Sequence, residues 1–109
     1  MKNVNNVIGI IGLGYVGLPL CLEFGRHFKT IGFDISRKRI LECNNKSDAN
    51  LESSKDDFVR AEHATFTHDH LDLNACNIYI ITVPTPITQS KVPDFEPLIG
   101  ACKLIGDVI

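Results

Sequence analysis

The stretch IIGLGYVGLPL, residues 10–20, limits the possible folds more than any other part of the chain. It places three glycines, Gly12, Gly14 and Gly17, directly after the apolar run from Val7 to Ile11, and their spacing matches the pattern G-x-G-x-x-G. A short run that is apolar throughout is typical of a central strand buried on both faces of a parallel sheet. The sequence therefore predicts a strand, a tight glycine turn and a helix in immediate succession.

The segment from about 16 to 27 is predicted to be that helix. Apolar residues recur there at a spacing of four, which predicts a buried seam made of Val16, Leu20, Phe24 and Phe28. Small residues beside the seam would let the helix approach the sheet closely, namely Gly17, Cys21 and Gly25. Pro19 falls in the first turn of the helix, where the missing N–H costs little.

A second strand is predicted over 30–34, followed by a second helix. Ser36 has the residue type preferred at a helix N-cap, so the helix is expected to begin there and to end near Cys43. Its apolar residues Ile40 and Leu41 are expected to point inward.

The polar region 44–64 is interpreted as a loop with one short surface helix. Each serine of the pair 53–54 is followed three residues later by an aspartate, which is a capping-box pattern. A third short strand is predicted over 64–68. A short helical segment over 69–75 is then expected, with Asp69 as its cap.

A fourth strand is predicted over 77–83, and its apolar character indicates a place inside the sheet. Asp94 is expected to cap a last helix that carries Pro97 in its first turn. The buried seam of that helix is predicted to consist of Leu98, Cys102, Ile105 and Ile109.

This alternation of strands and helices predicts an α/β fold. We expect one domain over residues 1–109, the N-terminal part of a Rossmann-type doubly wound parallel sheet with about four strands in the order 3-2-1-4. Ligands in such sheets bind beyond the carboxyl ends of the strands where the order reverses, here between the first and fourth strands. The chain leaves the fourth strand at that crevice through Val83, Pro84 and Thr85. Thr85 offers a hydroxyl and an N–H between two prolines, and a rigid turn without a ligand is the alternative.

The glycine pattern in this setting predicts a site for a dinucleotide. Gly12 suits the tight turn, Gly14 lets a pyrophosphate touch the backbone, and Gly17 lets the helix pack against the strand. Tyr15 and Val16 complete the loop, where the helix N-terminus offers free N–H groups and a partial positive charge to the phosphates. A glycine turn that only packs is the alternative.

Asp34 lies 22 residues after Gly12, at the end of the second strand. A carboxylate there would accept hydrogen bonds from the adenosine ribose hydroxyls, and it would repel the 2′-phosphate of NADP. The expected cofactor is therefore NAD. NADP stays an alternative, because three basic residues follow at 37–39 and a nearby arginine can accommodate a 2′-phosphate.

Charge and hydropathy argue against several classes of partner. The chain carries 13 acidic and 11 basic residues, so no generic surface for polyanions and no nucleic-acid partner are expected. No apolar stretch reaches the roughly 20 residues needed to span a bilayer, and the first residues lack a small-residue cleavage site. A cytoplasmic protein without membrane contact is predicted.

The metal-ligating residue types do not form a recognisable site. His63, His68 and His70 lie near Asp69 and Asp72, yet the spacing of a zinc site is absent, so no metal is predicted. The four cysteines lack a C-x-x-C pair, which fits a reducing compartment. Two are placed on the predicted helical seams and interpreted as buried small hydrophobes, and two at the ends of elements: Cys21 and Cys102, then Cys43 and Cys76.

Three stretches, IGLGYVGLPL, IGFDISRKRI and YIITVPTPI, together resemble the N-terminal domain of the UDP-glucose/GDP-mannose dehydrogenase family. The resemblance covers nearly the whole chain, and the combination of GLGYVGLP with VPTP is more specific than a bare glycine pattern. The tail VPDFEPL resembles the branch that acts on UDP-N-acetylhexosamines for surface polysaccharide synthesis, such as the Vi-antigen type enzymes.

The resemblance implies oxidation of the C6 alcohol of a UDP-sugar to the uronic acid, with two NAD reduced per turnover. The family positions matched here are cofactor positions: the loop 12–17, Asp34 on the ribose, Arg39 near the adenosine and Thr85 in the VPTP turn. No catalytic residue is assigned, because the family's nucleophilic cysteine, its lysine and its water-positioning acids match nothing in this sequence. The chain alone is therefore expected to be inactive, and a longer protein is expected to be a homo-oligomer.

Three other functions remain open on the residues alone. A non-catalytic NAD-sensing module would share the glycine loop and Asp34 without requiring the VPTP turn. A methyltransferase would bind S-adenosylmethionine at a glycine-rich loop, without a pyrophosphate. A hydroxyacid dehydrogenase of the G-L-G-x-M-G type is disfavoured by Tyr15, Val16 and Pro19.

Overall fold

A computed structural model describes residues 6–48, 53–84 and 95–108. Thr85, Asp94 and Ile109 therefore lie outside the described residues. In chain order the elements are β1 (Val7–Ile11), α1 (Gly17–Gly25), β2 (Lys29–Phe33), α2 (Arg37–Asn44), α3 (Lys55–Arg60), β3 (Ala64–Thr67), the 3₁₀ helix η1 (His70–Ala75), β4 (Ile78–Ile81) and α4 (Glu96–Val108).

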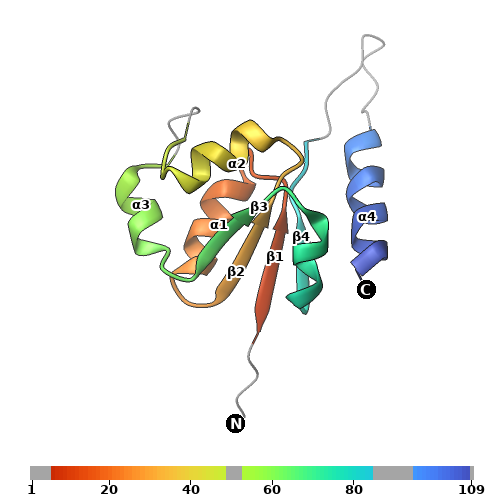
Figure 1. Ribbon diagram of the computed structural model, residues 1–109, viewed down its shortest axis with the longest axis horizontal. Coiled ribbons are helices and arrows are strands. Elements are labelled where there is room, and N and C mark those ends of the chain that lie inside the picture. Colours follow the sequence, from red (N-terminus) through yellow and green to blue (C-terminus); the bar gives the residue numbers. More distant parts are fainter. Residues whose placement is uncertain (1–5, 49–52, 85–94, 109) are drawn as a thin grey trace.

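The strands form one parallel sheet in the order β3-β2-β1-β4, which confirms the predicted fold class and strand order (Figure 1). Ile10 of β1 pairs with Gly32 on one side and with Ile80 on the other. Because all neighbours are parallel, the carboxyl ends of β1, β2 and β4 meet at one edge of the sheet, at the top of Figure 1. The strand order reverses at that edge between β1 and β4.

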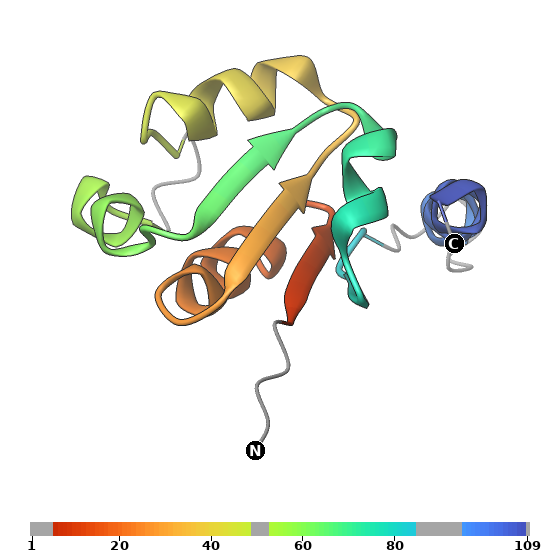
Figure 2. The ribbon, with the colours of Figure 1, turned by 60° about the horizontal axis from the view of Figure 1, so that its bottom comes forward.

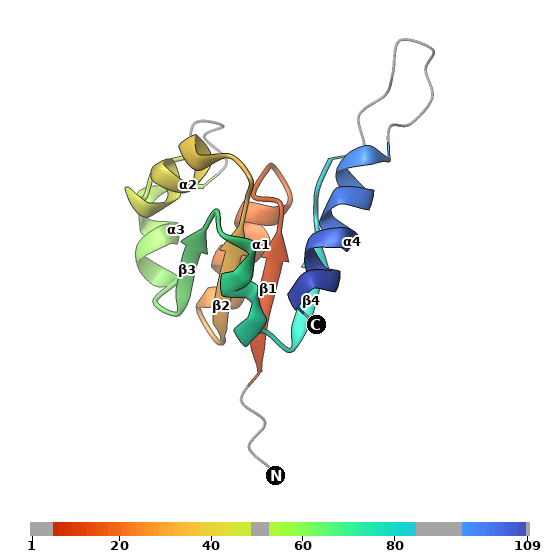
Figure 3. The same cartoon turned by 45° about the vertical axis from the view of Figure 1, so that its right-hand side comes forward.

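Two apolar clusters cover the two faces of the sheet. Ile8 and Ile10 point to one face, where they pack with α1, α2 and α3, whereas Ile11 points to the opposite face. The second face is covered by η1 and α4 (Figures 2 and 3). Successive side chains of a strand point to opposite faces of the sheet. In β1 both sets are apolar because helices cover both faces.

The seam predicted for α1 is wrong at both ends. Val16 and Phe28 are 66% and 42% exposed, and Leu20 and Phe24 are only half-buried. The buried face of the helix instead consists of Gly17, Leu18, Cys21, Leu22 and Gly25. A row at a spacing of four drifts around a helix of 3.6 residues per turn, so across three steps it leaves the buried face.

Two further seams differ from the prediction. In α2 the buried partner of Ile40 is Cys43, while Leu41 is 63% exposed. In α4 Cys102 is exposed, and the packed residues are Ala101, Leu104, Ile105 and Val108. This rotation brings α4 against η1 and β4.

β4 was expected inside the sheet, but it lies at an edge of the sheet formed by the described residues. Its residues are partly exposed, with Ile78 at 38%. The strand is apolar because residues on both of its faces pack into the apolar clusters. A central strand has the same apolar pattern, so the sequence could not distinguish the two positions.

The predicted helix caps that fall within the described residues are confirmed, whereas Asp94, the expected cap of α4, lies outside them. The Ser36 side chain accepts from the Arg39 N–H, and Asp69 accepts from the Leu71 N–H. Of the two serines considered for α3, Ser54 is the cap, and it forms a reciprocal capping box with Asp57. The starts of α2, α3 and η1 are thus set by local side chains.

We predict that Gly25→Ala lowers the free energy of unfolding by about 1–3 kcal/mol, because overpacking strains a close contact. An added Cβ at Gly25 would lie 2.6 Å from the Cβ of Ala64 and 3.2 Å from its backbone N and Cα. Gly106→Ala is the matched control: it adds the same methyl group to open space in α4 and is expected to stabilise by about 0.5–1 kcal/mol. Urea denaturation of both variants tests the pair, and equal midpoints would contradict the packing argument.

Candidate functional site

The glycine loop, residues 12–17, turns the chain sharply from β1 into α1. Gly12 has φ of 103°, in the left-handed region that favours glycine, and an added Cβ would lie 2.9 Å from the Val83 nitrogen. At Gly17 an added Cβ would overlap the Gly12 carbonyl oxygen and crowd the Thr82 hydroxyl. The first and third glycines are therefore required by close packing within the protein itself.

Gly14 has a different surrounding. A Cβ at this position would meet nothing within 4 Å, and the residue is exposed. The backbone N–H groups of Gly14, Tyr15 and Val16 donate no hydrogen bond within the described residues. They stand at the N-terminus of α1, where unsatisfied N–H groups and the helix dipole attract an anion. Gly14 thus leaves an open approach to unpaired donors.

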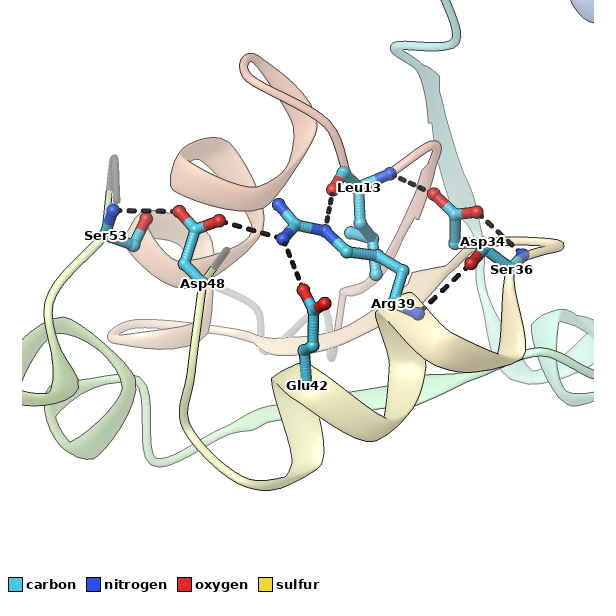
Figure 4. A network of polar contacts seen from close by, with 7 residues as sticks. All are labelled: Leu13, Asp34, Ser36, Arg39, Glu42, Asp48 and Ser53. Atoms are coloured by element: carbon cyan, nitrogen blue, oxygen red, sulfur yellow. Dashed lines mark hydrogen bonds and ion pairs between the residues drawn. The ribbon is translucent and has the colours of Figure 1, made fainter. Parts of the chain in front are cut away.

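Asp34 follows β2 directly and faces the glycine loop (Figure 4). Its Oδ2 accepts a hydrogen bond of 2.9 Å from the Leu13 N–H, and its Oδ1 accepts one of 2.9 Å from the Ser36 N–H. A carboxylate has about four acceptor sites, so these two bonds orient the group without exhausting it.

Arg39 lies behind the glycine loop, with its side chain 11% exposed. Its Nε donates to the Leu13 carbonyl oxygen at 2.6 Å, and its Nη1 lies 3.1 Å from Glu42 Oε1 and 2.8 Å from Asp48 Oδ1 (Figure 4). Burial lowers the pKa of Arg39, but the hydrogen bonds to Asp48 and Glu42 outweigh it, so that the pKa is raised above its usual value. The Nη2 atom is buried without a partner within the described residues.

A cleft of about 660 Å³ opens in front of the loop and is largely apolar. One wall comes from α4, which contributes Pro97, Gly100, Ala101 and Leu104. Among the predicted site residues, five line this cleft: Gly12, Gly14, Asp34, Val83 and Pro84. The volume lies in the range of small-molecule and cofactor sites.

The remaining predicted site residues fall elsewhere. Tyr15 and Val16 are exposed at the start of α1, Gly17 is buried beneath the loop, and Arg39 does not line the cleft. Thr85 lies outside the described residues. Sequence reasoning missed the α4 wall, because the helix seam was assigned to the wrong side, and it also missed Ile35, which follows Asp34 and lines the cleft.

Three of the four thiols are buried and unsuited to nucleophilic chemistry. Burial, reinforced by the neighbouring Cys43 thiol, raises the pKa of Cys21 to about 12. Burial also raises the pKa of Cys43 to about 11, although Arg39 opposes this, and burial raises the pKa of Cys76. Cys102 is exposed, against the expectation of a buried seam. The thiolate is the reactive form, so the buried thiols are inert.

The described residues contain neither a metal-binding cluster nor a membrane-spanning helix. Within the described residues, no three His, Cys, Asp or Glu side chains are close enough to hold a metal ion together. No helix in the described part of the chain combines the length and the apolar character required to cross a membrane.

The parallel sheet, the open Gly14 position, the unpaired N–H groups of the loop and the carboxylate directly after β2 are the features of a dinucleotide-binding domain of the Rossmann type. The chain belongs to the UDP-glucose/GDP-mannose dehydrogenase family, whose NAD binding domain matches residues 6–109. NAD is therefore the cofactor of this domain, as the sequence predicted.

Individual relatives agree with the family assignment. A UDP-N-acetyl-D-glucosamine 6-dehydrogenase of Salmonella typhi is 50% identical over 102 residues, which cover 94% of this chain and 24% of that protein. Protein CapL of Staphylococcus aureus is 40% identical, over 97% of this chain and 25% of CapL. The structure of a ternary complex of GDP-mannose dehydrogenase from Pseudomonas aeruginosa superposes with a TM-score of 0.87 at 25% identity, covering 94% of this chain and 25% of that one. The chain spans about a quarter of the length of these relatives.

We predict that native protein at pH 8 is alkylated by iodoacetamide at Cys102 alone. The raised pKa of Cys21, Cys43 and Cys76 keeps these buried thiols protonated at that pH. Mass spectrometry of the intact chain counts the adducts, and denatured protein is the control, in which all four cysteines should react. Rapid native labelling of a second cysteine would show that the buried thiols are accessible.

Proposed function

We propose that this chain is the NAD-binding part of a nucleotide-sugar 6-dehydrogenase. The full enzyme would oxidise the C6 alcohol of a UDP-N-acetylhexosamine to the uronic acid, with two NAD reduced per turnover, for surface polysaccharide synthesis. The observation that carries this proposal is the 50% identity to a UDP-N-acetyl-D-glucosamine 6-dehydrogenase over 94% of the chain. A second such enzyme, from Pseudomonas aeruginosa, is 44% identical. A longer protein of this kind would work in the cytoplasm as a homo-oligomer.

The role of the chain's own residues follows from the cleft. The free N–H groups of Gly14, Tyr15 and Val16 would bind the pyrophosphate at the N-terminus of α1. The oriented carboxylate of Asp34 would accept the ribose hydroxyls, and the apolar wall from α4 would exclude water from the adenine side. Bound NAD supplies the acceptor for the hydride that leaves C6. These residues bind and orient; none of them is assigned a chemical step.

The preference for NAD over NADP is supported by the surroundings of Arg39. A 2′-phosphate beside Asp34 would meet a negative charge. The Arg39 guanidinium, one of the basic groups at 37–39 that could compensate, is already bonded to Leu13, Glu42 and Asp48. The contact of Arg39 with the adenosine and the contact of Thr85 in the VPTP turn stay predictions.

NADH is expected to bind the chain at least about tenfold more tightly than NADPH, measured by calorimetric titration. Asp34→Asn should weaken NADH binding about tenfold and narrow the difference between the two cofactors, because a charged hydrogen-bond acceptor for the ribose is lost. Glu62→Gln, which removes an exposed carboxylate away from the cleft, is the matched control and should behave as the parent chain. Equal binding of NADH and NADPH by the parent chain would refute the preference.

Activity separates the dehydrogenase proposal from a non-catalytic NAD-sensing module. The 109-residue chain alone should not reduce NAD in the presence of UDP-N-acetylglucosamine, because it holds no residue assigned to the chemistry. A longer protein that also carries the three quarters of the relatives' length not covered by this chain should reduce NAD with this substrate. The absorbance of NADH measures the reaction. Absence of turnover by that longer product with every UDP-N-acetylhexosamine tested would favour the sensing module.

A further inference from the structure

Thr82 follows β4 directly and lies beneath the glycine loop, although nothing in the sequence pattern marked it. Its Oγ1 lies 2.6 Å from the Gly12 carbonyl oxygen and 3.3 Å from the Ile11 carbonyl oxygen. A hydroxyl has one proton to donate, and Ile11 already accepts the Thr82 backbone N–H at 2.8 Å. The side-chain proton therefore goes to Gly12. No other donor to that carbonyl is present within the described residues.

The Gly12 carbonyl shares one planar peptide group with the Leu13 N–H. In a trans peptide these two groups point in opposite directions, so fixing one aims the other. The Leu13 N–H donates to Asp34 Oδ2 at 2.9 Å. A continuous series of hydrogen bonds thus runs from Thr82 through this peptide to Asp34, and it connects the ends of β4, β1 and β2.

We propose that Thr82 is a positioning residue for the cofactor site: its hydroxyl sets the peptide between Gly12 and Leu13 and, through that peptide, the carboxylate of Asp34. The inference rests on the proposed role of Asp34 at the ribose. The Thr82 hydroxyl also lies where a side chain at position 17 would point, so it helps to define the loop that ends at Gly17. Thr82 does not line the cleft, and it acts only through its neighbours.

Thr82→Val removes the donor and keeps the shape, whereas Thr82→Ser keeps the donor. We expect Thr82→Val to weaken NADH binding three- to tenfold. It should also lower the ratio of NADH affinity to NADPH affinity, because an Asp34 carboxylate that is no longer held discriminates less between the two cofactors. Thr82→Ser should restore most of the NADH affinity and most of this ratio. Thr65→Val, at an exposed position of β3, is the matched control and should leave both quantities unchanged. An unchanged cofactor ratio in Thr82→Val would overturn the proposal even if the variant were less stable.

A double-mutant cycle tests whether Thr82 acts through Asp34. If it does, Thr82→Val should add little to the loss in Asp34→Asn, because coupled residues are not additive. Full additivity of the two losses would overturn the proposal.

Amide hydrogen exchange gives a test that needs no cofactor. In Thr82→Val the Leu13 amide should exchange at least about tenfold faster relative to the amides of β1, since the peptide is no longer held at its carbonyl. A Leu13 exchange rate that changes only in step with the amides of β1 would overturn the inference. If the parent chain bound no NADH, the proposed function would fail by itself, and the exchange experiment would still decide the role of Thr82.

Discussion

The close approach of Gly17 to the Gly12 carbonyl is the constraint on which the rest of the site depends. No side chain fits between these two residues, so α1 can begin immediately behind the end of β1. That approach places the helix N-terminus at the edge of the sheet where β1, β2 and β4 end. Because the turn from Gly12 to Gly17 is so tight, the free N–H groups at the start of α1 lie at the same edge as the carboxylate after β2 and the turn after β4.

The polar contacts around the loop hold some of its peptide groups from inside the protein and leave the Gly14, Tyr15 and Val16 N–H groups free within the described residues. The carbonyls of Gly12 and Leu13 are held from inside the protein by Thr82 and Arg39, and the Leu13 N–H is held by Asp34. The peptide that carries the Leu13 carbonyl also carries the Gly14 N–H, which therefore points away from Arg39. Arg39 can hold this carbonyl because Asp48, with its side chain only 1% exposed, anchors the guanidinium. Removal of Asp48 would take from Arg39 its shorter ion pair, at 2.8 Å, and a buried charge that loses its partner destabilises the fold.

The elements that the sequence predicted correctly are those with a local physical signal. The glycine turn, the Ser36 and Asp69 caps, a cap from the serine pair 53–54 and the strand order follow from backbone geometry, short hydrogen bonds and the rules of parallel sheets. The helix seams were less predictable, because several apolar faces of α1 and α4 were compatible with the pattern and tertiary packing chose between them. For the same reason the sequence did not reveal the parts of the site that depend on tertiary packing. Neither the α4 wall of the cleft nor the network of Arg39 and Asp48 has a signature at a fixed spacing.

The position of α4 is the least local feature of the site, yet it determines the width of the cleft. The helix packs through Ala101 and Ile105 into the cluster that contains Leu73 of η1. Near the C-terminal end of α4, Asp107 Oδ2 lies 3.6 Å from Nε2 of His70 in η1. The cleft wall is therefore supported by η1 more than by the strand that precedes the helix. Gly100 adds no side chain to this wall, and a Cβ there would meet nothing within 4 Å, so the residue leaves room in the cleft that Asp34 and Ile35 also line. An apolar wall in the same cleft as a polar loop suits a ligand with an aromatic base at one end and a charged diphosphate at the other.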